Sequence, residues 1–250
     1  MCPDMEHRKM YLSHILRVVD CLIMPSEFLR EMYTSVIPDL DRIRVIPFSI
    51  DTDWLQDVGP QTEVGSIRFG SISHIAPIKG IHLAVEAFKG LSVEYGASLS
   101  IWGELPENSS YTNQLRALAS GVQGISFHGR FAPDQLGQVF SQVDVVLVPS
   151  LWYENNPLVI QTALAAGRPV IATNLGGMSS LVHHEINGLL FERDNVADLS
   201  LQLRRVTSEP GLLERLRQGA HETTGAATEV DEIVRVYQQV MSHSRARQNE

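Results

Sequence analysis

The fold is decided by residues 149–177, which read P-S-L-W-Y-E-N-N-P-L-V-I-Q-T-A-L-A-A-G-R-P-V-I-A-T-N-L-G-G. They follow the run V-D-V-V-L-V (143–148), which is too apolar for a strand with one solvated face and so belongs near the centre of a parallel sheet. A loop with one acid, Glu154, leads to a helix that begins near Pro157, and a second apolar strand (169–172) ends before Gly176-Gly177. This order of strand, helix and strand predicts a right-handed βαβ unit.

The same alternation runs through most of the chain. Segments between the strands place apolar residues at helical spacing, for example at positions 83, 84, 87, 88 and 91. We therefore predict an α/β fold, in which a Rossmann-like parallel sheet carries helices on both faces. Apolar runs of strand length occur at residues 21–24, 44–46, 67–69, 99–102, 125–127, 143–148, 170–172 and 188–191.

Composition excludes several classes of function. The formal net charge of −9 argues against a nucleic-acid or anionic-membrane surface, because either needs clustered Lys and Arg. No run of 18 apolar residues predicts a transmembrane segment, and the N-terminus does not resemble a signal peptide. Two cysteines give no disulfide framework, so we expect a cytoplasmic protein. The nine histidines show no zinc-site spacing, and we expect no metal.

A change in composition marks a domain boundary. Residues 50–66 are polar and rich in turn-forming residues, and they separate two strands from a block that contains six. The first block offers a helix (6–19), a strand, a helix after the N-cap Ser26 and a second strand, which is too little to bury a domain core alone. We predict domains at residues 1–48 and 49–225, followed by a helix and tail at residues 226–250.

The string at residues 149–177 resembles the donor-binding core of the group 1 glycosyl transferases. These are retaining enzymes with two Rossmann-like domains (the GT-B type), and they include glycogen and sucrose synthases. The resemblance implies that residues 49–225 are the nucleotide-sugar donor domain and residues 1–48 a remnant of the N-terminal acceptor domain with the hinge. It also implies that about 150 residues of the acceptor domain are missing. The expected partners are therefore a separate N-terminal domain chain or a second copy of this chain.

The resemblance assigns roles at the donor site. Lys79, in I-A-P-I-K-G (75–80), matches the lysine of an R-x(4)-K-G element that binds the donor diphosphate, while His74 takes the place of its arginine. We expect Pro77 and Gly80 to open a helix with Lys79 in its first turn. The carboxylate of Glu154 is expected near the donor sugar as the catalytic residue, and the amides of Leu158 and Val159 are expected to point toward the diphosphate.

Besides His74, two more positions depart from the pattern of the family. Thr162 stands at the second position of a Glu-x(7)-Glu motif, where the family has a glutamate that accepts both ribose hydroxyls. Ser180 stands at the acid of a G-G-x-x-E element, whose glycines, Gly176 and Gly177, are expected to bind the nucleotide sugar. Both departures lie at positions that the resemblance assigns to nucleotide binding.

Two further residues are candidates for the nucleotide site. Gly103 ends a strand at the expected ligand edge and would form a wall for the nucleotide. Arg130 lies in a loop whose backbone, by the resemblance, meets the base. Each also has a simpler explanation as an ordinary turn residue.

The sequence therefore predicts a glycosyltransferase, or its donor-binding half, that moves a sugar from a nucleotide-diphosphate sugar to an unknown acceptor with retention. No cofactor is expected beyond this donor substrate. One alternative is a catalytically degenerate relative that acts by weak binding or protein contacts. The other is a sugar-nucleotide epimerase on the same two-domain fold, although the acid and histidine set of an epimerase's first domain is absent from this chain.

Overall fold

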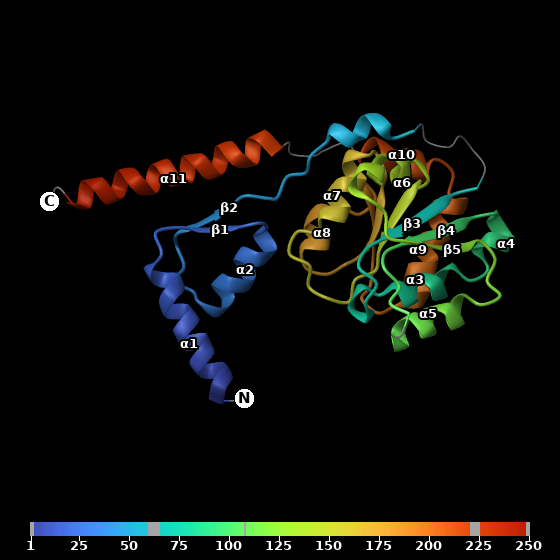
Figure 1. Ribbon diagram of the computed structural model, residues 1–250, viewed down its shortest axis with the longest axis horizontal. Coiled ribbons are helices and arrows are strands. Elements are labelled where there is room, and N and C mark those ends of the chain that lie inside the picture. The colour runs from blue at the N-terminus through green and yellow to red at the C-terminus, as the bar shows by residue number, and fades with distance from the viewer. Residues whose placement is uncertain (1–2, 60–65, 108, 221–225, 249–250) are drawn as a thin grey trace. The chain divides into compact units, whose positions relative to one another are not determined.

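The computed structural model describes residues 3–59, 66–107, 109–220 and 226–248 (Figure 1). The chain divides into two compact units, one formed by residues 50–223 and the other by residues 1–49 together with 224–250.

The larger unit is built on a six-stranded parallel sheet, which confirms the predicted α/β class. Its strand order is β5-β4-β3-β6-β7-β8. All four residues of β6 are buried, and the strand pairs with β3 on one side and β7 on the other, as its apolar sequence predicted. The strands are β3 (Arg68–Ile72), β4 (Ser98–Trp102), β5 (Ile125–Gly129), β6 (Val145–Val148), β7 (Val170–Thr173) and β8 (Gly188–Phe191).

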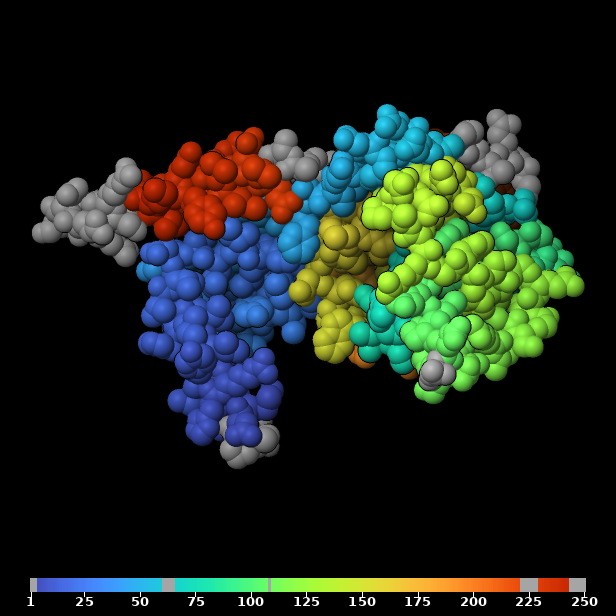
Figure 2. All heavy atoms as spheres, in the orientation of Figure 1, coloured from blue at the N-terminus to red at the C-terminus, as the bar shows by residue number. Residues whose placement is uncertain are grey.

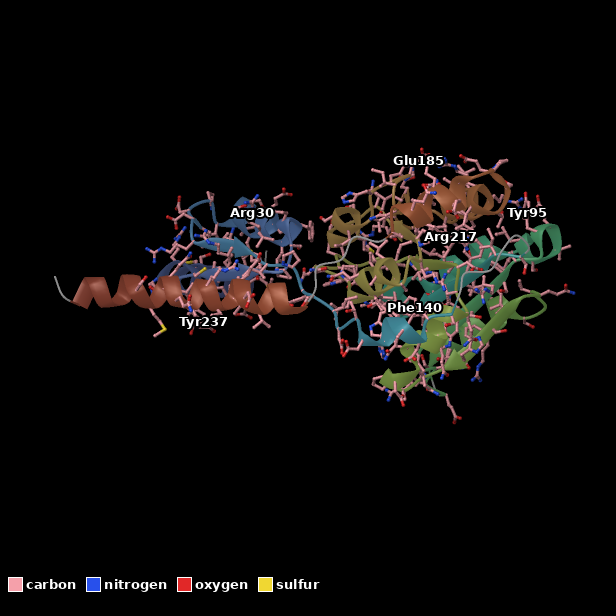
Figure 3. All side chains as sticks on the ribbon, turned by 90° about the horizontal axis from the view of Figure 1, so that it is seen from above. Arg30, Tyr95, Phe140, Glu185, Arg217 and Tyr237 are labelled. Carbon is pink, nitrogen blue, oxygen red and sulfur yellow. The ribbon has the colours of Figure 1, made fainter. Side chains whose placement is uncertain are left out.

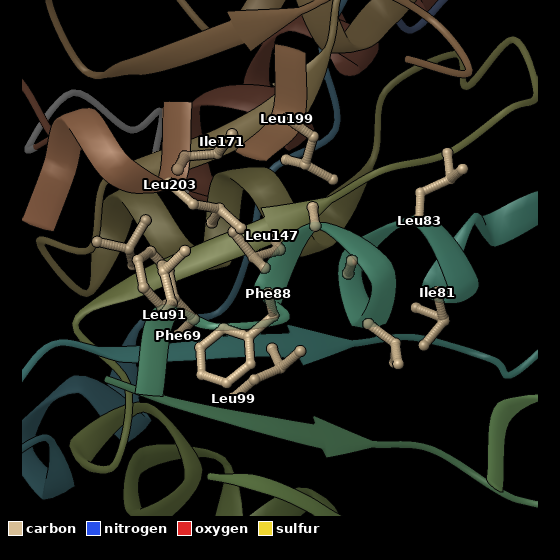
Figure 4. Close-up of a cluster of buried hydrophobic side chains, with 14 of the residues drawn as sticks. Phe69, Ile81, Leu83, Phe88, Leu91, Leu99, Leu147, Ile171, Leu199 and Leu203 are labelled. Atoms are coloured by element: carbon tan, nitrogen blue, oxygen red, sulfur yellow. The ribbon is translucent and has the colours of Figure 1, made fainter. Parts of the chain in front are cut away.

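Helices cover both faces of this sheet (Figure 1). One cluster of buried side chains joins the strands to α3 (Ile81–Phe88), α4 (Leu91–Tyr95), α5 (Ser110–Ala119), α9 (Val196–Ser208) and α10 (Leu212–Gln218). Figure 4 shows Phe88 of α3, Leu203 of α9 and the strand residues Phe69 and Leu147 among the side chains of this cluster. The second cluster joins the other face to α6 (Leu136–Ser141), α7 (Leu158–Ala165) and α8 (Gly177–Leu181).

A short 3-10 helix, η1 (Asp53–Asp57), fastens the start of the larger unit to α6. The ring centroid of Trp54 lies 5.4 Å from that of Phe140, and the amide of Gly59 donates to Ser141 Oγ at 2.6 Å. The space-filling view shows η1 (cyan) and α6 (yellow-green) side by side on one surface (Figure 2). Two more 3-10 turns, η2 (Pro77–Lys79) and η3 (Pro133–Gln135), lie in loops of the sheet.

The smaller unit contains a two-stranded parallel sheet and three helices. These elements are α1 (Pro3–Val18), β1 (Leu22–Met24), α2 (Glu27–Val36), β2 (Ile43–Val45) and α11 (Ala226–Gln248). Ser26 caps α2 as predicted, because its Oγ accepts from the amide of Leu29. The amide and hydroxyl of Ser49 both donate to Glu229 of α11, at 2.7 and 2.5 Å, and these bonds lower the pKa of the Glu229 carboxyl.

Charged side chains are buried at the amino edge of the large sheet. Asp144, immediately before β6, accepts two hydrogen bonds at 3.0 Å from the guanidinium of Arg68 and one at 3.5 Å from Arg217 (labelled in Figure 3). Arg168, immediately before β7, is fully buried and donates to the carbonyls of Phe140 and Gly59. Burial lowers the pKa of Arg168 to about 10, and the charge of Asp144 opposes that shift. The carboxylate of Asp144 therefore neutralises part of the positive charge of these arginine side chains at the sheet edge.

Among the helices that the structure describes, none is long and apolar enough to cross a lipid bilayer.

Because Asp144 is buried, neutralising its carboxylate should greatly lower the free energy of unfolding. Changing Asp144→Asn leaves Arg68 and Arg217 without their shared carboxylate, and we expect unfolding to become easier by about 3–5 kcal/mol. Urea denaturation of the full chain, followed by tryptophan fluorescence, measures this, because Trp54, Trp102 and Trp152 all lie in the larger unit.

The matched control is Glu94→Gln, which removes a carboxylate paired with Arg204 on the surface. The urea midpoint of this variant should stay close to that of the parent, because exposed ion pairs contribute little. Equal midpoints for the two variants would show that Asp144 does not stabilise the sheet edge.

Candidate functional site

The strand order places a crevice at the carboxyl edge of the large sheet. The chain leaves β3 toward α3 on one face and leaves β6 toward α7 on the other, so the connections diverge where these adjacent strands end. Ligands bind at such a switch point in open α/β sheets. Lys79 follows β3 and Glu154 follows β6, so the reversal of strand order brings both residues to this crevice.

Lys79 and Glu154 form an ion pair in the crevice. Nζ of Lys79 lies 2.5 Å from Oε1 of Glu154, and the two side chains are 29 % and 17 % exposed. The hydroxyl of buried Ser150 donates to the same carboxylate oxygen at 3.0 Å. The groups border a cavity of about 30 Å³ whose lining is Ser71, Ile72, Ser73, Lys79, Ile81, Leu147, Val148, Pro149, Ser150, Glu154, Pro157 and Val159.

A larger cavity lies next to this one and shares Ile72 and Ser73 with it. Its volume is about 290 Å³, near the lower end of the range for small-molecule sites. Trp102 stacks on His128 in this part of the sheet, with ring centroids 4.7 Å apart. The predicted residues His74, Gly103 and Arg130 all line this cavity, together with Ile72, Ser73, Trp102, Glu104 and Phe131.

The local structure around Lys79 corrects one prediction. Lys79 does not lie in the first turn of α3: it ends the 3-10 turn η2, and Gly80 separates that turn from the helix. Gly80 has φ +65°, a left-handed conformation that interrupts the helix, and a Cβ there would lie 1.9 Å from the carbonyl oxygen of Pro149. The amide of His82, in the first turn of α3, donates to the hydroxyl of Tyr111 at 3.2 Å. This amide is therefore already used and is not open to an anion. The ammonium group of Lys79 does not stand in the first turn of α3, where a cation would oppose the helix dipole.

The loop that carries Glu154 is fixed from two sides. On one side, the amide of Leu151 donates to the carbonyl of Ile78 at 2.8 Å. On the other, the amide of Gly177 donates to the carbonyl of Glu154 at 2.7 Å, and a Cβ on Gly177 would lie 1.9 Å from the carbonyl oxygen of Asn155. Gly177 was predicted to contact the nucleotide, but its amide is already used by this loop.

The remaining predicted residues lie around α7 and α8. Leu158 and Val159 form the first turn of α7, which leaves their amides without partners inside the helix. Val159 lines the smaller cavity, whereas Leu158 is half-exposed. Thr162 donates its hydroxyl to the carbonyl of Leu158 at 2.7 Å, and Gly176 caps the start of α8. Neither Thr162 nor Gly176 is part of the lining of the two cavities.

Two residues of the site were missed by the sequence analysis. Ser150 lies two residues after the end of the buried strand β6, and a serine so close to a strand's carboxyl end was a usable signal. Glu104 forms an ion pair with Arg130 at the exposed border of the larger cavity, a contact between loops that no spacing indicates. Within the described ranges, no group of three or more His, Cys, Asp or Glu residues could hold a metal ion.

Comparison with known proteins shows which family the chain matches. Residues 66–209, more than half of the chain, match the family described as Glycosyl transferases group 1. An uncharacterized glycosyltransferase of Methanocaldococcus jannaschii is 27 % identical over 214 residues, which are 80 % of this chain and 54 % of that protein. The chain thus spans about half the length of the curated relatives it matches.

Solved structures share the fold. A glycosyltransferase from Rickettsia africae superposes with a TM-score of 0.81 at 18 % identity, covering 93 % of this chain and 66 % of that one. The Anabaena protein HepE in complex with UDP gives a TM-score of 0.77 at 19 % identity, covering 89 % of this chain and 65 % of that one. The parallel sheet with helices on both faces is therefore the fold of these glycosyltransferases.

The close approach at Gly80 predicts a specific destabilisation. Gly80→Ala places an alanine in the left-handed backbone conformation and forces its Cβ against the carbonyl of Pro149. The change should therefore destabilise the larger unit by roughly 3–5 kcal/mol. The control Gly121→Ala has φ +75° with no atom within 4 Å of the new Cβ, and should cost only about 1–2 kcal/mol. Urea denaturation compares them, and equal losses would mean that the contact with Pro149 contributes nothing.

Proposed function

The chain belongs to the group 1 glycosyl transferases, and from that membership we propose that its larger unit binds a nucleotide-diphosphate sugar whose sugar is transferred, with retention, to an acceptor. The observation that carries the proposal is the convergence of Lys79 and Glu154 at the switch point of the sheet, 75 residues apart in sequence. A cation and a carboxylate at this position supply partners for a diphosphate and for sugar hydroxyls respectively. Membership of a transferase family does not favour the alternative of a non-catalytic relative.

The diphosphate would be held by Lys79 and by the first amides of α7, those of Leu158 and Val159. When the bond between the anomeric carbon and the phosphate oxygen breaks, the nucleoside diphosphate leaves with the electron pair. Its added negative charge is stabilised by a nearby ammonium group and by amides at a helix N-terminus. Val159 and Lys79 both line the smaller cavity, which supports this placement.

The nucleoside would occupy the larger cavity, between the carboxyl ends of β3, β4 and β5. The polar groups of His74 and Arg130 lie along its lining, with Gly103 beside them. HepE, which has the same fold, was solved with UDP and with UDP-glucose, and this supports UDP as the first nucleotide to test.

The smaller unit would belong to the acceptor domain. We infer that residues 1–48 are the end of that domain with the hinge, that residues 49–225 are the donor domain, and that the C-terminal helix and tail follow at residues 226–250. Large apolar side chains are exposed on α1 and α2, including Met10, Tyr11 and Met32. Such surface suits packing against further domain structure, supplied by a separate chain or a second copy. Transfer needs both substrates held across the two domains, since positioning provides much of the rate.

The role of Lys79 gives the test of this proposal. Lys79→Met should weaken binding of UDP by about tenfold to a hundredfold, because a hydrogen bond to a charged group contributes roughly 1.5–3 kcal/mol. Isothermal titration calorimetry on the full chain measures the change. Lys89→Met, which removes an exposed lysine just after α3, should leave the affinity unchanged. Equal affinities for the two variants would refute the proposed diphosphate site.

Two of the three departures from the family pattern, His74 and Thr162, give a second test. The double change His74→Arg and Thr162→Glu should tighten UDP binding, because it restores a cation and a carboxylate where the family has them. Sugar transfer should remain undetectable until an acceptor domain is supplied. Unchanged UDP affinity in calorimetry would show that these positions lie outside the nucleotide site, and transfer by the unmodified chain alone would disprove the need for a second domain.

A further inference from the structure

We propose that the Lys79–Glu154 ion pair makes the site discriminate a nucleotide that carries a sugar from the bare nucleoside diphosphate. This inference rests on the proposed function and assigns Glu154 a second task, as an internal anion that occupies the lysine when no ligand is bound. The carboxylate then competes with the diphosphate for Lys79, and a sugar relieves that competition.

The geometry sets up this competition. The Nζ–Oε1 distance of 2.5 Å leaves no room for another group between the two charges. The cavity that they border measures about 30 Å³, enough for one or two water molecules but not for a diphosphate. The ammonium group keeps two further N–H donors, but an anion that binds them must share its single positive charge with Glu154.

The carboxylate cannot easily leave with the loop. The carbonyl of Glu154 is held by the amide of Gly177, and Leu151 ties the preceding turn to Ile78. The hydroxyl of Ser150 lies within 3.0 Å of the carboxylate oxygen and is itself buried. After Lys79 turns to a phosphate, Glu154 therefore remains in the crevice as a partly desolvated anion.

The effect of the ion pair on affinity depends on whether the ligand carries a sugar. A bare nucleoside diphosphate takes Lys79 and places more negative charge beside a carboxylate that has lost its cation, which weakens binding. A sugar on the diphosphate brings hydroxyl donors, and these can replace the ammonium group as partners of Glu154. The pair therefore favours the donor and promotes release of the nucleotide after transfer.

The experiment is a double-mutant cycle on nucleotide affinity. Calorimetry on the full chain first ranks UDP, ADP and GDP, and the tightest binder is then compared with its glucose, galactose and N-acetylglucosamine conjugates. The proteins are the parent chain, Glu154→Gln, Lys79→Met and the double variant. Glu94→Gln, which removes a carboxylate paired with Arg204 on the surface, controls for the change in net charge.

We expect Glu154→Gln to bind the nucleoside diphosphate about fivefold to tenfold more tightly than the parent chain. The best sugar conjugate should gain less than twofold, because it loses the charged acceptor for its hydroxyls. In the Lys79→Met background, Glu154→Gln should change affinity by less than twofold, because there is no cation to release. Glu94→Gln should leave every affinity unchanged.

Three results would overturn the inference while leaving the proposed function intact. One is that Glu154→Gln fails to tighten the bare nucleotide although Lys79→Met weakens it. Another is an equal gain for the bare nucleotide and for every conjugate. The third is a gain that persists without Lys79. If none of the nucleotides binds, or if Lys79→Met has no effect, the proposed function itself fails. Thermal melting of each variant identifies any that do not fold.

Discussion

The reversal of strand order between β3 and β6 is the constraint on which the site depends. Both strands are central, parallel and buried, so their carboxyl ends meet at one edge while the chain departs from them toward opposite faces. This divergence opens the crevice and brings two loops into contact over a distance of 75 residues in sequence. Close backbone approaches at Gly80 and Gly177 then fix those loops against each other and against the sheet.

Charged side chains are paired differently at the two edges of the sheet. At the amino edge, Asp144 is held by Arg68 and Arg217 in an arrangement that no ligand needs to complete. At the carboxyl edge, Lys79 and Glu154 neutralise each other through a single contact and remain partly open to solvent. The first arrangement stabilises the fold. The second can be exchanged for ligand contacts, because the same two charges that pair in the empty site match a diphosphate and a hydroxyl-rich sugar.

Much of the fold was predictable from the sequence, and the reason is periodicity. The run V-D-V-V-L-V identified a central strand, and residues 188–191 were predicted as the strand that the structure contains. The rule that parallel strands end at one edge also brought Lys79 and Glu154 to the same side.

Periodicity does not report backbone torsions, so the 3-10 turn before Gly80 was predicted wrongly as the start of α3. Nor does it report long-range partners: Asp144 of the run V-D-V-V-L-V pairs with Arg217, which lies 73 residues away. The use of the Gly177 amide by the Glu154 loop likewise depends on tertiary packing.

Lys79 pairs with two anions in turn, the carboxylate of Glu154 in the empty site and a phosphate in the occupied one. A crystal structure of the chain with a bound UDP-sugar would show this exchange. In it, Lys79 Nζ should lie out of contact with Glu154 and within hydrogen-bond distance of a phosphate oxygen, while a sugar hydroxyl donates to Glu154. A ligand bound elsewhere on the larger unit, or bound in the crevice with the Lys79–Glu154 contact intact, would contradict it.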